Sequence, residues 1–491
     1  MTHEGPRPDT PVTTRHGVPH VVVPAPGPVR ARLLFRVGIA DEPLYRRGIT
    51  HLVEHLTMRA VFRRPVQVEA HVGAWSTAFE ATGALEAVTA FLEDVWRTLS
   101  DLPLDALDVE REVLRLEGRD RGASPAVESA HHRYGLTGPG LVYADELGLP
   151  GLTAEDVRAW VAERFVRGAA VVAATADVRP DLSGGLPDGP ARDLTVTVLA
   201  RPARGPVWVG DTGGTAVSLL LPVRDGLDLA VGRLLRTAAE QVVRHEKGLA
   251  YEVGMDVVEV GPDLTEVAVH ADCDEERHAE VADLLVGVLR RFRDHGPSEA
   301  DVALERDTTV AVWQDAPDAL EVATESAVAL LLGQEPRSLA VRVHDAQQLT
   351  ASAVRDVVSR AWPSLQVLLP VEEEPGVEGV HECVHTDEAL PGRVHCGNPL
   401  AFALPGARLP ASPSVTVTAG ERGLTLRMDD EVVSIAWEEV AAVVDEGDGL
   451  LVISSRGEAI SLPDGTFWRS GRLRRTVEDR VDRSRFVPRR A

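Results

Sequence analysis

Two histidines and a glutamate lie close together in the segment 48–58, which reads GITHLVEHLTM. His51 and His55 are four residues apart, so on a helix they share one face and lie one turn from each other. Both imidazoles can then reach a single metal ion, with Glu54 beside the second of them. The spacing predicts half of a metal site, because zinc takes about four ligands, one of them water if the site is catalytic. A polar rim on an amphipathic helix would give the same pattern.

A second acidic segment can supply the missing protein ligand. Residues 105–117 read DALDVEREVLRLE and have the apolar repeat of a helix packed on a core, formed by Leu107, Val113, Leu114 and Leu116. Glu110 and Glu117 are seven residues apart, nearly two turns, so they share one face of this helix. A carboxylate on that face can complete the site, although a solvated charged helix has a similar composition.

Taken together, these segments resemble a known peptidase family. H-x-x-E-H at 51–55, followed by EREVLRLE at 110–117, is similar to the pitrilysin, insulin-degrading enzyme and mitochondrial processing peptidase family. The resemblance implies a zinc-dependent metalloendopeptidase in which His51, His55 and Glu117 bind Zn²⁺. It also implies that Glu54 is the general base and that Glu110 is a supporting acidic residue behind the ligands.

A third segment extends the resemblance to the second half of the chain. Residues 244–251 read RHEKGLAY, which is similar to the substrate-holding motif of this family, with Arg244 and Tyr251 around a Gly-Leu turn. A helix end with a glycine cap is the simpler interpretation of the same residues. The likeness covers residues 10–370, half of the family's four-domain clamshell. It therefore implies a homodimer or a heterodimer with a related subunit, in which Arg244 and Tyr251 serve the partner's zinc.

The chain departs from the family pattern in two places. The spacing between His55 and Glu117 is shorter than usual by about one strand and turn, and residues 76–79 (STAF) replace an Asn-containing strand motif. We therefore expect a trimmed edge strand beside the cleft and an altered substrate preference. An unstructured peptide, such as a leader peptide, is the expected substrate. A catalytically silent peptide-binding or scaffold subunit of a heterodimeric peptidase is the alternative, and a peptide sensor read out by the C-terminal domain is a third hypothesis.

The expected fold class is α+β, with two repeated α/β-sandwich domains and then a small β-barrel closed by a C-terminal helix. This last part resembles a pleckstrin-homology-like domain. The expected divisions are a catalytic domain at 1–182, a linker at 183–206, an inactive repeat at 207–370, an acidic linker at 371–413 and the barrel at 414–491. Within them we expect strands at 13–23 and 75–82, a short helix from 65, and one helix over 298–332.

Composition limits the partners and the compartment. The net charge of −25 disfavours nucleic acid and anionic membranes, and no apolar run is long enough to span a bilayer. Three cysteines are too few for a disulfide framework, which together with a polar N-terminus predicts a cytoplasmic protein. A Cys/His cluster between 371 and 399 allows a second metal site, but an ordinary linker is the favoured interpretation. Its members are His381, Cys383, His385, His395 and Cys396.

Overall fold

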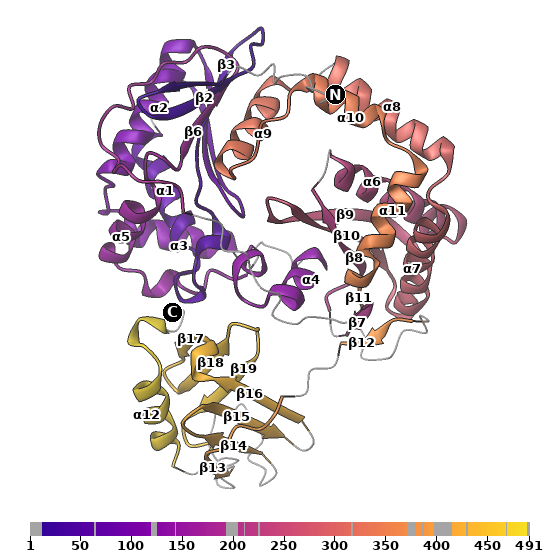
Figure 1. Cartoon of the computed structure of the whole chain (residues 1–491). Helices are drawn as coiled ribbons and strands as arrows, with labels where there is room; N and C mark the ends of the chain where they lie inside the picture. The colour runs from indigo at the N-terminus through magenta and orange to yellow at the C-terminus, as the bar shows by residue number, and fades with distance from the viewer. Residues whose placement is uncertain are drawn as a thin grey trace, which may run out of the picture.

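The fold has two larger α/β units and a smaller β unit at the C-terminal end (Figure 1). The computed structural model describes residues 12–62, 65–118, 125–142, 144–192, 205–210, 212–223, 226–315, 318–370, 379–383, 387–396, 415–428, 431–467 and 469–488. Within these ranges, no helix is both long and apolar enough to cross a membrane.

The first unit is built on a six-stranded sheet with the order β1-β2-β6-β3-β5-β4. Its strands are β1 Val12–Arg15, β2 Val18–Val22, β3 Val29–Phe35, β4 Gln67–Val72, β5 Thr77–Gly83 and β6 Ala170–Ala174. The single strand predicted at 13–23 was wrong, because His16 and Gly17 both have positive φ and form a hairpin turn. The short helix predicted from 65 was also wrong. That segment is the edge strand β4, which pairs with β5 over six residues and lies at the edge where trimming was expected.

Helices pack against this sheet around an apolar core that contains Phe35, Leu52 and Phe91. They are α1 Ile49–Val61, α2 Leu85–Ser100, α3 Leu107–Glu117 and α5 Ala154–Arg164. α5 starts at a capping box that Thr153 and Asp156 form. On α3, only Leu114 of the predicted apolar face is fully buried, and Val113 and Leu116 are exposed.

The second unit repeats this strand order in its own sheet, β12-β7-β11-β8-β10-β9. Its strands are β7 Val207–Val209, β8 Thr215–Pro222, β9 Ala250–Gly261, β10 Leu264–Cys273, β11 Gln366–Leu368 and β12 His381–Glu382. The two sheets differ only in their outermost strand, which is β1 in the first and β12 in the second. The other five strands follow the same order in both sheets, with β2, β6, β3, β5 and β4 matching β7, β11, β8, β10 and β9. The predicted internal repeat is therefore present in the sheet topology, and β9 occupies the edge position that β4 has in the first unit.

The helices of the second unit are α6 Leu227–Glu240, α7 His278–His295, α8 Glu299–Asp315, α9 Ala319–Leu331, α10 Leu339–Gln347 and α11 Ala351–Ala361. Residues Gln241–Glu246 continue α6 as a π-helical turn. The single helix predicted over 298–332 was wrong, because Asp318 caps a new helix, α9, with its side chain on the amides of Leu320 and Glu321.

Each of these two units contributes a helix to the other. α4 (Pro125–Tyr134) belongs to the first half of the chain but packs on the second sheet, where Tyr134 joins Val258 and Ala268. In return, α9 packs on the first sheet beside β6 (Figure 1). Arg133 of α4 forms an ion pair of 3.0 Å with Glu266 of β10, and both side chains are buried. This exchange fixes how the two sheets face each other.

The C-terminal unit contains two four-stranded sheets, β13-β14-β15-β16 and β19-β18-β17-β20. Its strands are β13 Arg393–Cys396, β14 Thr416–Ala419, β15 Gly423–Met428, β16 Glu431–Ala436, β17 Val440–Asp445, β18 Gly449–Ser454, β19 Ala459–Pro463 and β20 Phe486–Pro488. The helix α12 (Ser470–Arg480) buries Leu473 and Val477 in the apolar core that both sheets share. The unit thus has the strands and the C-terminal helix that were expected over 414–491, and β13 lies before this range.

The segment expected as the linker 371–413 contributes β12 to one sheet and β13 to another. This separates the members of the Cys/His cluster, because His381 lies on β12 and His395 and Cys396 lie on β13. His385 lies outside the described residues. In the described part of the chain, the only cluster of metal-ligating side chains is the one on α1 and α3.

Candidate metal centre and substrate cleft

The helix α1 presents both histidines to one point. It begins at Gly48, whose φ of +102° is a left-handed conformation, and the buried carboxylate of Glu42 accepts hydrogen bonds from the amides of Gly48 and Thr50. This fixes the first turn of the helix directly before His51. The imidazole rings of His51 and His55 then lie 4.8 Å apart, nearly perpendicular to each other.

Glu117, at the end of α3, completes the predicted set. Its carboxylate oxygens lie 3.8 Å from His51 Nε2 and 3.5 Å from His55 Nε2. Ligands bound at about 2.0 to 2.1 Å in a tetrahedron are about 3.4 Å apart, so these separations leave room for one zinc ion between the three groups. Two imidazole nitrogens and one carboxylate are also ligands that zinc accepts. The donor chemistry and the spacing therefore both fit zinc.

Two further carboxylates hold the imidazoles from behind. His55 Nδ1 lies 3.1 Å from Glu110, which also accepts a 2.8 Å hydrogen bond from Arg59. His51 Nδ1 lies 2.8 Å from Glu146. A carboxylate beside Nδ1 of each ring favours a proton on that atom, and in the neutral ring this leaves Nε2, which lies toward Glu117, in the unprotonated form that metal binding requires.

Glu146 was missed from the sequence. It lies in the glycine-containing segment between α4 and α5, and it is 95 residues from its partner His51. No helical or strand period marks such a residue. Its side chain is 5% exposed and also lies 3.6 Å from the buried Arg47.

Glu54 lies beside the ligand set without being part of it. Its carboxylate is 3.7 Å from His51 Nε2 and 3.8 Å from His55 Nε2. Burial raises the pKa of Glu54, while the two histidines act in the opposite direction. A carboxylate whose pKa is raised toward neutrality is suited to accept and return a proton.

Arg244 and Tyr251 lie next to each other but away from this cluster. Arg244 is in the π-helical turn after α6, and its guanidinium lies 5.6 Å from the centre of the Tyr251 ring. Tyr251 is 79% exposed at the start of β9. Neither residue lines the cleft that contains His51 and Glu54. The structure therefore brings together the metal-site residues, and it brings together the Arg/Tyr pair, but it does not join the two groups within one chain.

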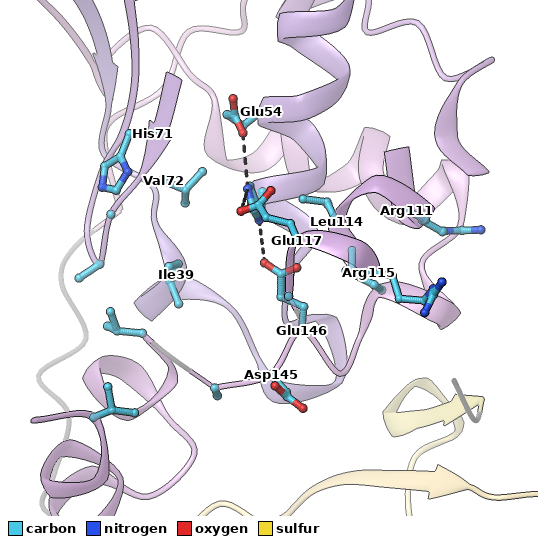
Figure 2. A pocket seen from close by; sticks show the side chains of 18 of the residues that line it. Ile39, Glu54, His71, Val72, Arg111, Leu114, Arg115, Glu117, Asp145 and Glu146 are labelled. Carbon is cyan, nitrogen blue, oxygen red and sulfur yellow. Dashed lines mark hydrogen bonds and ion pairs between the residues drawn. The ribbon is translucent and has the colours of Figure 1, made fainter. Parts of the chain in front are cut away.

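A cleft of about 1710 Å³ opens in front of the three candidate metal ligands. Figure 2 shows Glu54, Glu117 and Glu146 on one wall, with His71 and Val72 of β4 on the opposite wall. The edge strand β9 of the second unit also lines the cleft through Val257, Val258 and Glu259. A hydrogen bond of 3.0 Å from Trp75 Nε1 to the carbonyl of Glu259 joins the two units at this wall. An extended peptide can pair with an edge strand through its backbone, and two such edges meet this cleft.

Comparison with known proteins identifies the fold. No family profile matches the sequence, and no curated protein matches it. Among solved structures, a protease from Helicobacter pylori has a TM-score of 0.57 at 15% identity, over 74% of this chain and 99% of that one. An inactive peptidase M16 domain from Pseudomonas fluorescens has a TM-score of 0.58 at 15% identity, over 73% of this chain and 97% of that one.

Pitrilysin matches with a TM-score of 0.52 at 13% identity, over 75% of this chain and 45% of the pitrilysin chain. At these identities the likeness shows the fold alone. The two α/β units have the fold of M16 peptidases, which confirms the predicted pitrilysin-like architecture at that level.

Proposed function

We propose that this M16-like chain is a zinc-dependent metalloendopeptidase that cleaves unstructured peptides. The observation that carries the proposal is the convergence of His51, His55 and Glu117 beside the buried carboxylate of Glu54. The cleft in front of these groups and the edge strand β4 support a peptide as the ligand. Peptidases among the solved structures with the same fold support the reaction class.

The roles of the residues follow from their positions. His51, His55 and Glu117 would hold Zn²⁺, and a bound zinc ion lowers the pKa of its water and polarises a carbonyl. Glu54 takes the proton of the attacking water and returns it to the leaving amine. Glu146 and Glu110 hold the two imidazoles in the tautomer that directs Nε2 into the site. The free edge of β4 pairs with the peptide backbone and places the scissile bond beside Glu54.

We infer that the active form is a homodimer, or a heterodimer with a related subunit. The Arg244–Tyr251 pair is exposed and lies outside the cleft of its own chain. In a dimer it would enter the partner's cleft, where the hydroxyl and the guanidinium stabilise the oxyanion. The chain spans 45% of the pitrilysin chain.

We also propose a cytoplasmic location and a pleckstrin-homology-like barrel for the C-terminal unit. The domains would follow the expected divisions at 1–182, 207–370 and 414–491, except that β12 joins the second unit and β13 joins the C-terminal unit. The location rests on the three cysteines, which form no disulfide with one another. The barrel rests on two small sheets that share a core with α12.

A catalytically silent peptide-binding subunit is the competing function. The inactive domain among the solved structures shows that this fold occurs without activity, and a single chain here lacks an Arg/Tyr pair in its own cleft. The experiment that separates the two measures zinc content and cleavage of an unstructured peptide for the wild type and for Glu54→Gln. Cleavage by the zinc-loaded wild type that the variant loses supports the peptidase. A zinc-loaded wild type that binds the peptide and never cuts it supports the silent subunit.

A further inference from the structure

The C-terminal unit lies against the loop that carries Glu146. This loop spans residues 135–153, of which the structure describes all but residue 143. In Figure 1 the β17 side of the C-terminal unit faces the first unit, and β13 and β14 lie on its far side. Three separate parts of the C-terminal unit meet the loop, near its beginning, its middle and its end.

The beginning of the loop is fixed by a backbone hydrogen bond. The amide of Leu136 donates to the carbonyl of Ser455, in the turn after β18, over 2.8 Å. The preceding residue, Gly135, has a φ of +63°, and a Cβ atom at this position would lie 2.2 Å from the same carbonyl. Only glycine allows the loop and the turn to approach this closely.

The middle and the end of the loop are held by apolar contacts. Leu141 and Ala144 belong to one cluster with the fully buried Ala442 of β17, and Leu147, the neighbour of Glu146, packs against this cluster. At the end of the loop, a Cβ atom on Gly151 would lie 3.0 Å from Pro488 of β20. Pro488 also lines the same cleft as Glu146.

The loop transmits these contacts to the metal site. Glu146 accepts a hydrogen bond from His51 Nδ1 at 2.8 Å. The loop is also bound to the start of α1, because Arg47 donates from Nε to the carbonyl of Leu141 and from a terminal nitrogen to Glu42, which caps that helix. A small displacement of the loop would therefore move the acceptor that orients the imidazole of His51.

We propose that the C-terminal unit is a positioning part of the metal centre: by packing on the loop 135–153 it holds Glu146 against His51 and so sets the affinity for the metal. This inference rests on the proposed zinc site. Losing a carboxylate that holds a metal-bound histidine typically lowers metal affinity about 10-fold to 100-fold. Releasing the loop should therefore weaken zinc binding by a factor in this range. Because coupling is reciprocal, metal binding must also strengthen the packing of β17 on the loop by the same factor.

The test uses the full chain with Ala442→Arg, which places a cation in the buried contact. The control is Val394→Arg on β13, at a position that is 58% exposed on the other sheet. Zinc dissociation constants come from competition with a chromophoric chelator, and hydrogen exchange follows the peptides of the loop and of β17. We expect weaker zinc binding by about 10-fold or more and faster exchange of the loop in Ala442→Arg, with neither change in Val394→Arg. If Ala442→Arg does not fold, Ala441→Arg makes the same test at a partly exposed position of β17.

The reciprocal measurement uses the wild type and Glu146→Gln. Zinc should slow hydrogen exchange in β17 of the wild type and have a smaller effect in the variant. The proposal is overturned if Ala442→Arg releases β17, as seen by exchange, while zinc affinity stays within twofold of the wild type. A wild type that binds no zinc refutes the proposed function instead. In that case, equal loop exchange in metal-free wild type and Ala442→Arg would also refute the positioning role.

Discussion

Replacing Glu146 by glutamine tests the residue that sequence reasoning missed. The substitution keeps the shape of the side chain but removes the charge that accepts from His51 Nδ1 at 2.8 Å and faces the buried Arg47 at 3.6 Å. A hydrogen bond to a charged group contributes about 1.5 to 3 kcal/mol. Since about 1.4 kcal/mol corresponds to a factor of ten, we expect zinc affinity to fall about 10-fold to 150-fold.

Glu110→Gln is the matched comparison for Glu146→Gln. Glu110 holds His55 over a longer distance of 3.1 Å, and its second partner, Arg59, is 53% exposed. We therefore expect a smaller loss of affinity from Glu110→Gln. Chelator competition at fixed pH and salt measures both variants, and thermal unfolding of the metal-free proteins shows whether the fold is kept. A Glu146→Gln protein that is folded and binds zinc as tightly as the wild type would refute this account of the site.

Three further predictions address the partner, the pH dependence and the metal. Tyr251→Phe should lower kcat about 100-fold, and mixing it with Glu54→Gln should restore activity, because one cleft of the mixed dimer is then intact; mixtures no more active than either variant alone would exclude a site shared between subunits. Burial and the charge of Arg15 lower the pKa of His20 from 6.5 to about 4. As the pH falls from 6.5 to 4, His20 becomes protonated in the unfolded chain but stays neutral in the folded one. The free energy of unfolding should therefore fall by about 3 kcal/mol over this range. His20→Leu should make the free energy of unfolding, measured by denaturant titration at each pH, depend less on pH. An equal pH dependence in the variant and the wild type would contradict this prediction. Removal of zinc by a chelator should lower Tm, because zinc binds only the folded site, and an unchanged Tm would argue against a bound ion.

The convergence of the three proposed zinc ligands could be predicted from sequence because regular helices carry them. In α1, four-residue spacing is enough to place both imidazoles on one face, and the structure has them 4.8 Å apart. In α3, the helical period puts Glu110 and Glu117 on one face, and both reach the histidines. The period was less reliable for burial, since Val113 and Leu116 have helical spacing but face solvent.

The features that were missed have both local and distant causes. β4 was mistaken for a helix although its six residues, QVEAHV, alternate polar and apolar, so the strand pattern was present in the sequence and was overlooked. The break before α9 has a local signal, because Pro317 directly precedes Asp318 in the sequence and Asp318 caps the helix. Asp318 also binds Arg30 of the first unit, a contact that local sequence does not reveal. Glu146 lies in a loop whose position is set by the C-terminal unit, and local sequence cannot reveal that contact.

In the proposed site, three side chains from α1 and α3 share one zinc ion. The direct measurement is an anomalous difference map at the zinc absorption edge, from crystals of the protein purified with zinc. We expect one peak within about 2.0 to 2.2 Å of His51 Nε2, His55 Nε2 and a carboxylate oxygen of Glu117. A zinc-loaded crystal with no peak at this position, or with a peak that Glu117 does not reach, would contradict the claim.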